Sequence, residues 1–156
     1  MRNLCKDKRG DLLITTLAIF VLLLGMGTFV AEYLKVNGIN DHLETELNRA
    51  VNLSIKEAMY DSYRQDYLNK LDPNVAKDKF YRYLYEDLDL DSNMEKHQPG
   101  QKKYAYKVEI QDIEIDGENA KMKVKAVANV PCVFVGLPDW QLPINVGSRN
   151  MRVDGK

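Results

Sequence analysis

The sequence predicts an α+β protein in which a long N-terminal helix crosses a membrane and a smaller mixed domain follows. Three observations predict this fold. Residues Leu12–Ala31 carry no charge, an apolar repeat of three and four residues continues beyond them, and the repeat shortens to two from Tyr104 onward. A repeat of three and four residues is the period of a helix, and a repeat of two residues is the period of a strand. We expect a short second helix between the long helix and a C-terminal antiparallel β-meander.

The uncharged segment, LLITTLAIFVLLLGMGTFVA, is long enough to cross a bilayer. Its twenty residues would span about 30 Å as a helix, which matches the hydrocarbon thickness. The preceding leader, residues 1–10, carries four basic side chains and a single acidic one. Because cytoplasmic flanks are enriched in Lys and Arg, we expect a single-pass protein of the cell membrane. Its N terminus would be cytoplasmic and the rest extracytoplasmic, with residues 11–31 as the transmembrane helix.

Three interpretations of the N-terminal segment remain open. A cleaved secretory signal would use the small residues Gly25-Met26-Gly27 after its apolar core. An uncleaved anchor needs only the length and the flanking charge. In a prepilin-type leader, the short basic peptide ends in Gly, and a cut between Gly10 and Asp11 leaves the apolar segment on the mature chain. A prepilin peptidase would then be a partner.

Residues 32–71 extend this helix with an amphipathic pattern. The apolar stripe includes a candidate packing face made of Leu43, Leu47, Val51 and Ser54. Charged residues fill the other side of the helix. The stripe must pack on the C-terminal part or on other subunits, because it would otherwise face water. Asn37-Gly38 is the one point where we expect a kink or a weakened helix.

Residues 72–156 are predicted to form an extracytoplasmic α+β domain. Asp72 is a good N-cap and Pro73 suits the first helical position, so a second helix is expected over residues 73–88. Residues 92–101 are predicted to be a loop.

The remaining pattern predicts a meander of three strands. The first covers residues 104–115, with a bulge at Gln111-Asp112, and the second covers residues 120–130. A third strand is expected from Trp140 to Val146, with Met151 and Val153 as its continuation or as a fourth strand. A turn over residues 116–119 would pair acidic with basic side chains on the solvated face. The expected pairs are Glu114 with Lys121, Asp112 with Lys123, and Glu109 with Lys125.

The composition gives little sign of catalytic or cofactor chemistry. The acidic body has no basic patch, so nucleic acid is not an expected partner. Cys5 and Cys132 would lie on opposite sides of the membrane and cannot bridge. His42 and His97 belong to no triad or metal-ligand spacing. We therefore expect no enzyme activity, no catalytic residue and no cofactor.

One acidic run is weakly similar to the start of a calcium-binding loop. Its candidate ligands are Asp87, Asp89 and Asp91. Counted from Asp87, Ser92 and Gln98 stand where an EF-hand loop needs Gly and a bidentate Glu. The pattern favours a solvated acidic helix end over a metal site.

The first sixty residues resemble the TadE/TadG-like family of tight-adherence (Flp-type) pilus assembly proteins. The resemblance rests on Lys8-Arg9-Gly10, the apolar segment that follows, Glu32-Tyr33, and LNRAVNLSIKEA at residues 47–58. It implies a pilin-like fold, a membrane-anchored minor pilin or assembly factor, and other pilin-like or assembly-apparatus subunits as partners. If the cut follows Gly10, the fifth mature residue is Thr15, where type IV pilins usually carry Glu.

The expected function is therefore structural. The chain would be a pseudopilin-like subunit of a pilus or secretion apparatus, held in membrane lipid and assembled through its N-terminal helix. The alternative is a single-pass anchored or secreted extracytoplasmic module that binds a ligand or an envelope component.

Overall fold

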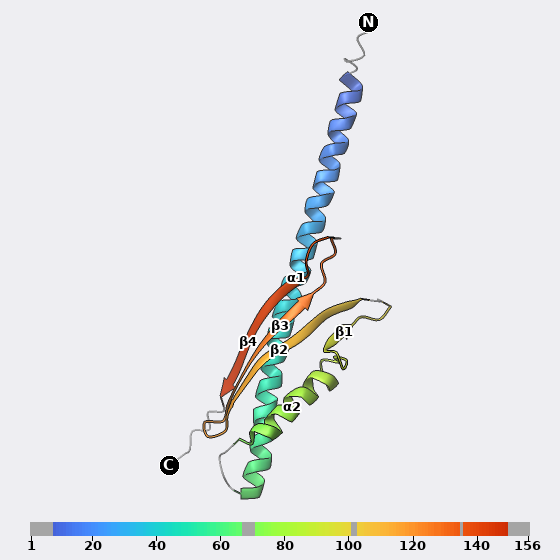
Figure 1. Ribbon diagram of the computed structural model, residues 1–156. Helices are drawn as coiled ribbons and strands as arrows, with labels where there is room; N and C mark the ends of the chain where they lie inside the picture. The colour runs from blue at the N-terminus through green and yellow to red at the C-terminus, as the bar shows by residue number, and fades with distance from the viewer. Residues whose placement is uncertain (1–7, 67–70, 101–102, 135, 150–156) are drawn as a thin grey trace. The chain divides into compact units, whose positions relative to one another are not determined.

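The computed structural model describes residues 8–66, 71–100, 103–134 and 136–149, with side chains of the first helix described from residue 12 to residue 59. Two helices are followed by four strands in the order α1, α2, β1, β2, β3, β4. Figure 1 shows these elements along the chain. The α+β fold class expected from the sequence is confirmed.

The chain divides into two compact units, Met1–Asn37 and Gly38–Lys156. Unit 1 contains the apolar segment. Unit 2 contains the first helix from Gly38 onward together with everything that follows it. The helix from Gly38 onward belongs to unit 2 because its buried stripe supplies part of that unit's core.

Helix α1 runs from Lys8 to Asp66. It is helical on both sides of Asn37-Gly38, so Gly38 does not end it. Within unit 2 its apolar stripe is buried. The stripe consists of Leu43, Leu47, Ala50, Val51, Ser54, Ile55, Ala58 and Met59. The hydroxyl of Ser54 donates to the carbonyl of Ala50 at 2.6 Å, which satisfies this buried polar group.

Helix α2 runs from Pro73 to Glu86, two residues shorter than expected. Asp72 is the N-cap, as predicted, and its Oδ1 accepts from the backbone N–H of Asn74 at 2.8 Å and of Val75 at 3.3 Å. These bonds satisfy donors that the first turn of a helix leaves without partners. The buried side of α2 is made of Ala76, Phe80, Tyr83 and Leu84.

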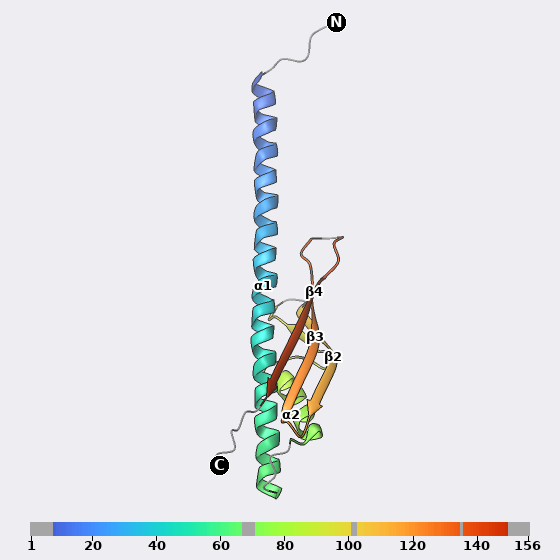
Figure 2. The same ribbon diagram turned by 90° about the vertical axis from the view of Figure 1, so that its left-hand side faces the viewer.

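The sheet is a four-stranded antiparallel meander with strand order β1-β2-β3-β4. The strands are Glu95–His97, Tyr104–Asp116, Lys121–Val130 and Trp140–Arg149. Met151 and Val153, expected to continue the last strand or to form another, lie outside the part of the chain that the structure describes. In β3, Met122, Val124, Ala126, Ala128 and Val130 are buried while Lys123 and Lys125 are exposed. Only one face of the sheet is therefore buried. The second half of α1 runs beside the sheet (Figure 2).

The register of the β2–β3 hairpin differs from the expected one by two residues. Glu114 pairs with Lys123 and Asp112 with Lys125, and Val127, not Lys125, lies opposite Glu109. The bulge at Gln111 is confirmed, since the register shifts between Ile110 and Asp112.

The turn explains this two-residue difference. Asp116, which was expected in the turn, is in the ladder and pairs with Lys121. Its carboxylate accepts from the backbone N–H groups of Glu118 and Asn119 and from the Asn119 side chain, at 2.7–3.2 Å. Ala120 leaves the ladder and takes φ +45°. A two-residue shift preserves the alternation of faces, so the dry face was predicted correctly while the ion pairs were not.

Strand β1 was not expected, because its three residues lie in the stretch predicted to be a loop. Glu95 pairs with Lys107 and Lys96 with Tyr106. The strand has no apolar alternation, so its position follows from pairing with the edge of β2 and not from its own sequence.

Candidate functional site

The apolar segment of α1 is the most distinctive surface of the described chain. Its large side chains between Leu12 and Val30 are 54% to 70% exposed. Soluble proteins rarely leave contiguous apolar surfaces of this size in water. The segment contains a helix long and apolar enough to cross a membrane, with a mean hydropathy of 2.4 in its best window.

Polar groups within this segment are satisfied by the helix itself. The hydroxyl of Thr16 donates to the carbonyl of Leu12, and that of Thr28 to the carbonyl of Gly25, both at 2.8 Å. Such back-bonding removes the cost of placing a hydroxyl in hydrocarbon. A Cβ added at Gly25 or Gly27 would meet nothing within 4 Å, so both backbone positions are open to close approach by another helix.

The candidate processing site lies at the start of α1. The helix begins at Lys8, so the Gly10–Asp11 peptide is in its first turn. Thr15 is one turn further on. Cys5 lies outside the described residues.

The predicted packing face is already occupied within unit 2. Leu43, Leu47 and Val51 are fully buried and Ser54 is 2% exposed. The sequence left open whether the C-terminal part of the chain or other subunits would cover this face. In the structure the chain's own C-terminal part covers it. This face is therefore not available for packing against another helix.

Polar contacts fasten α2 to α1 beside this buried face. The hydroxyl of Tyr83 donates to the Glu46 carboxylate at 2.7 Å. Burial and then this hydrogen bond raise the pKa of Tyr83 to about 12. Glu57 accepts from both Lys79 at 2.9 Å and Arg82 at 3.2 Å.

The acidic run does not gather its three expected ligands. Asp89 lies 3.1 Å from the ammonium group of Lys96, an ion pair. Asp91 instead joins Glu95 and His97, whose candidate donor atoms all lie within 4.8 Å of one another. Sequence reasoning missed this cluster because Glu95 and His97 lay in a predicted loop, and only strand pairing brings them beside Asp91.

The Asp91–Glu95–His97 cluster also has the geometry of surface ion pairs. The Nε2 atom of His97 is 3.5 Å from Asp91 and 3.7 Å from Glu95, and Lys107 lies 3.9 Å from Glu95. A hydrogen bond from the backbone N–H of Glu95 is the largest influence that lowers the pKa of Asp91. His97 is about half exposed, and we assign no metal to these residues.

A second apolar surface lies at the β3–β4 loop. Cys132, Leu137, Pro138, Asp139, Trp140 and Gln141 line an open hollow of about 530 Å³. Cys132 is a free, half-buried thiol.

No family model, curated protein or solved structure matches this chain.

Proposed function

We propose that the chain is a pilin-like structural subunit that is held in the cell membrane by residues 12–31 and assembles through that helix. The observation that carries the proposal is the contrast along α1. Large apolar side chains are exposed from Leu12 to Val30, whereas the stripe from Leu43 to Met59 is buried within unit 2. One part of α1 thus needs an external apolar partner and the other does not.

Lipid is the first such partner. Leu, Ile, Phe and Val side chains each favour the centre of a membrane-spanning helix, and those of residues 12–31 together contribute about −4 to −7 kcal/mol to insertion. The basic leader favours a cytoplasmic N terminus, which would place unit 2 on the extracytoplasmic side.

A neighbouring copy or a related subunit is the second partner. Packing between helices in lipid depends on close contact and small residues, and not on exclusion of water. Thr15, Gly25, Gly27 and Thr28 supply small surfaces. Because Leu43, Leu47 and Val51 are already buried, this packing would use the segment from Leu12 to Val30, as the resemblance to TadE/TadG-like proteins also implies.

Disulfide trapping tests the assembly. Single cysteines are placed in turn at residues 18–29 of the full chain that carries Cys5→Ser and Cys132→Ser, and membranes are oxidised. We expect dimer yield to peak every three to four positions, which is the spacing of one helix face. A uniformly low yield at native expression would leave a simple anchor and contradict assembly through this helix.

A further inference from the structure

The β3–β4 loop presents two exposed apolar side chains outside the N-terminal segment. Val133 is 67% exposed and Leu137 is 58% exposed. Among the described residues of unit 2, no other large apolar side chain has more than half of its surface exposed. We call Val133 and Leu137 the apolar tip.

The loop that carries the apolar tip is held by specific hydrogen bonds. Asp139 at its base accepts from the backbone N–H of Cys132 at 3.3 Å and from the hydroxyl of Tyr104 at 3.4 Å. The N–H of Leu137 donates to the carbonyl of Phe134 at 3.3 Å, and Gly136 has φ +94°, which suits glycine. The exposed side chains of Val133 and Leu137 thus lie on a turn that is held by hydrogen bonds.

The position of the loop within unit 2 follows from two contacts. The N–H of Leu71, just beyond α1, donates to the carbonyl of Gly117 at 2.9 Å, so the β2–β3 turn lies at the C-terminal end of α1. Ser148, near the end of β4, donates to Asn52 on α1.

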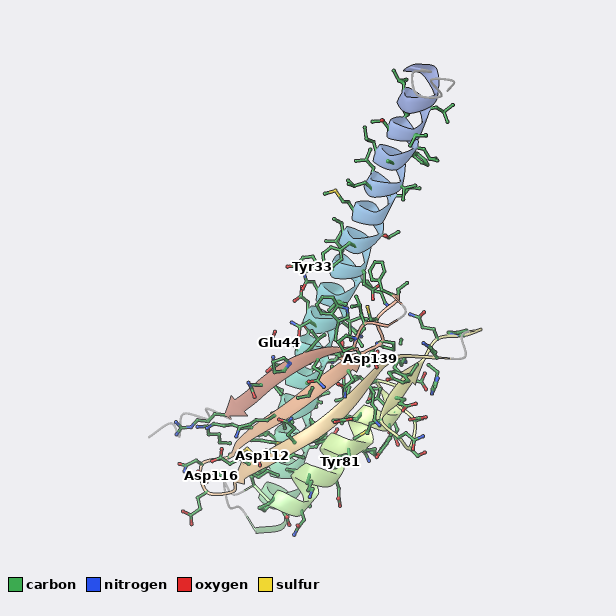
Figure 3. The ribbon with its side chains drawn as sticks, turned by 45° about the horizontal axis from the view of Figure 1, so that its top comes forward. Tyr33, Glu44, Tyr81, Asp112, Asp116 and Asp139 are labelled. Carbon is green, nitrogen blue, oxygen red and sulfur yellow. The ribbon has the colours of Figure 1, made fainter. Side chains whose placement is uncertain are left out.

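Strand β3 then carries the chain away from that turn for ten residues, or about 33 Å. The β3–β4 loop therefore lies at the opposite end of unit 2, where α1 enters at Gly38. Figure 3 shows Asp116 and Asp139 at opposite ends of the sheet.

Only residues 32–37 separate Gly38 from the end of the apolar segment, a rise of about 10 Å along a helix. The end of unit 2 that carries the apolar tip is therefore the end joined to the membrane-spanning segment. The loop from Pro131 to Gln141 contains no Lys or Arg, so its affinity for a bilayer would come from apolar contact and not from anionic lipid headgroups.

We infer that the β3–β4 loop is a second membrane contact, in which Val133 and Leu137 enter the interface of the bilayer that holds the N-terminal helix. The inference rests on the proposed membrane placement of residues 12–31. Two side chains are too few to bind a membrane alone, but the attached helix keeps them at high effective concentration near the surface. Trp140 and Tyr104 at the loop's base are the aromatic types enriched at membrane interfaces.

Site-specific fluorescence tests the contact. The full chain with Cys5→Ser and Cys132→Ser receives one cysteine, labelled with an environment-sensitive dye, in phosphatidylcholine vesicles with or without spin-labelled lipid. Leu137→Cys and Val133→Cys report the apolar tip. Glu118→Cys reports the exposed turn at the other end of the sheet, and Leu22→Cys reports the membrane-spanning segment.

We expect the spin-labelled lipid to quench the dye at residues 22, 133 and 137 several-fold more than at residue 118. Adding Leu137→Asp should lower quenching at Val133→Cys to the level at residue 118, whereas Leu137→Met should preserve it.

The outcomes separate this inference from the proposed function. Quenching at residue 22 with none at residues 133 and 137 would overturn the loop contact and leave the membrane placement standing. Absence of quenching at residue 22 would overturn both. A blue shift at residue 137 that rises with the protein-to-lipid ratio, without quenching by lipid, would mean that a second copy covers the tip and would also overturn the inference.

Discussion

The hydroxyl of Tyr83 on α2 donates a 2.7 Å hydrogen bond to the carboxylate of Glu46 on α1. Tyr83 is 8% exposed, so the bond forms largely away from water. Hydrogen bonds to charged groups contribute about 1.5–3 kcal/mol. This pair is therefore a principal polar contact between the two helices of unit 2.

Tyr83→Phe is expected to lower the free energy of unfolding by that amount at neutral pH. The measurement is urea unfolding of the full chain in mild detergent, followed by the fluorescence of Trp140, the single tryptophan. Tyr85→Phe is the matched control, because Tyr85 lies on the same helix and is 43% exposed. Equal stability of the two variants would contradict the role of the bond.

The same pair predicts a loss of stability at alkaline pH. The folded-state pKa of Tyr83 is raised from 10.0 to about 12, so its neutral form is favoured in the folded chain. The associated stability is fully present below pH 10 and is lost as the pH rises to about 12. The free energy of unfolding of the wild type should therefore fall more over this range than that of Tyr83→Phe. Parallel profiles of this free energy against pH would contradict the role of the Tyr83–Glu46 hydrogen bond.

Two glycines predict opposite responses to alanine. A Cβ on Gly117 would lie 2.8 Å from the carbonyl oxygen of Leu71, whereas one on Gly38 would meet nothing within 4 Å. Gly117→Ala should destabilise unit 2 by about 1–3 kcal/mol through overpacking. Gly38→Ala should stabilise α1 by up to about 1 kcal/mol. Thermal unfolding of both variants in detergent checks the pair, and a neutral Gly117→Ala would show that the turn does not approach Leu71.

The β2–β3 register predicts which charges interact. The ammonium group of Lys125 lies 3.0 Å from the Asp112 carboxylate on the solvated face. A double-mutant cycle with alanine should give a coupling of about 0.2–1 kcal/mol that falls with added salt. The Asp112–Lys123 cycle corresponds to the register expected from the sequence and should give almost no coupling. Coupling of Asp112 with Lys123 and not with Lys125 would support the expected register instead.

Sequence periodicity was sufficient to predict the elements that have a long apolar pattern. It was insufficient to predict contacts that depend on local polar groups. The stripe of α1, the Asp72 cap and the bulge at Gln111 were all predictable, because burial and backbone geometry require particular residue types there. The hairpin register was not, since Asp116 stays in the ladder and caps a longer turn. Strand β1 and the Asp91–Glu95–His97 cluster arise only from pairing with β2, which no local pattern encodes.

Charged substitutions in the apolar segment test its need for hydrocarbon. Ile19→Arg with Leu22→Arg should cost about 6–8 kcal/mol of insertion free energy. That loss is comparable to what all the large apolar side chains of the segment supply. The fraction of chain that resists carbonate extraction should fall sharply, while Ile19→Leu with Leu22→Ile keeps it unchanged. Retention of the arginine variant in membranes would mean that another part of the chain anchors it.

The intact mass of the chain purified from its own membranes, with its N-terminal sequence, tests the central claim most directly. We predict a membrane-bound product that retains residues 12–31; a start at Asp11 would support the pilin-like subunit, and an uncut chain would support a simple anchor. A soluble product that begins near Thr28 would contradict the account, because the helix proposed to hold and assemble the protein would be gone.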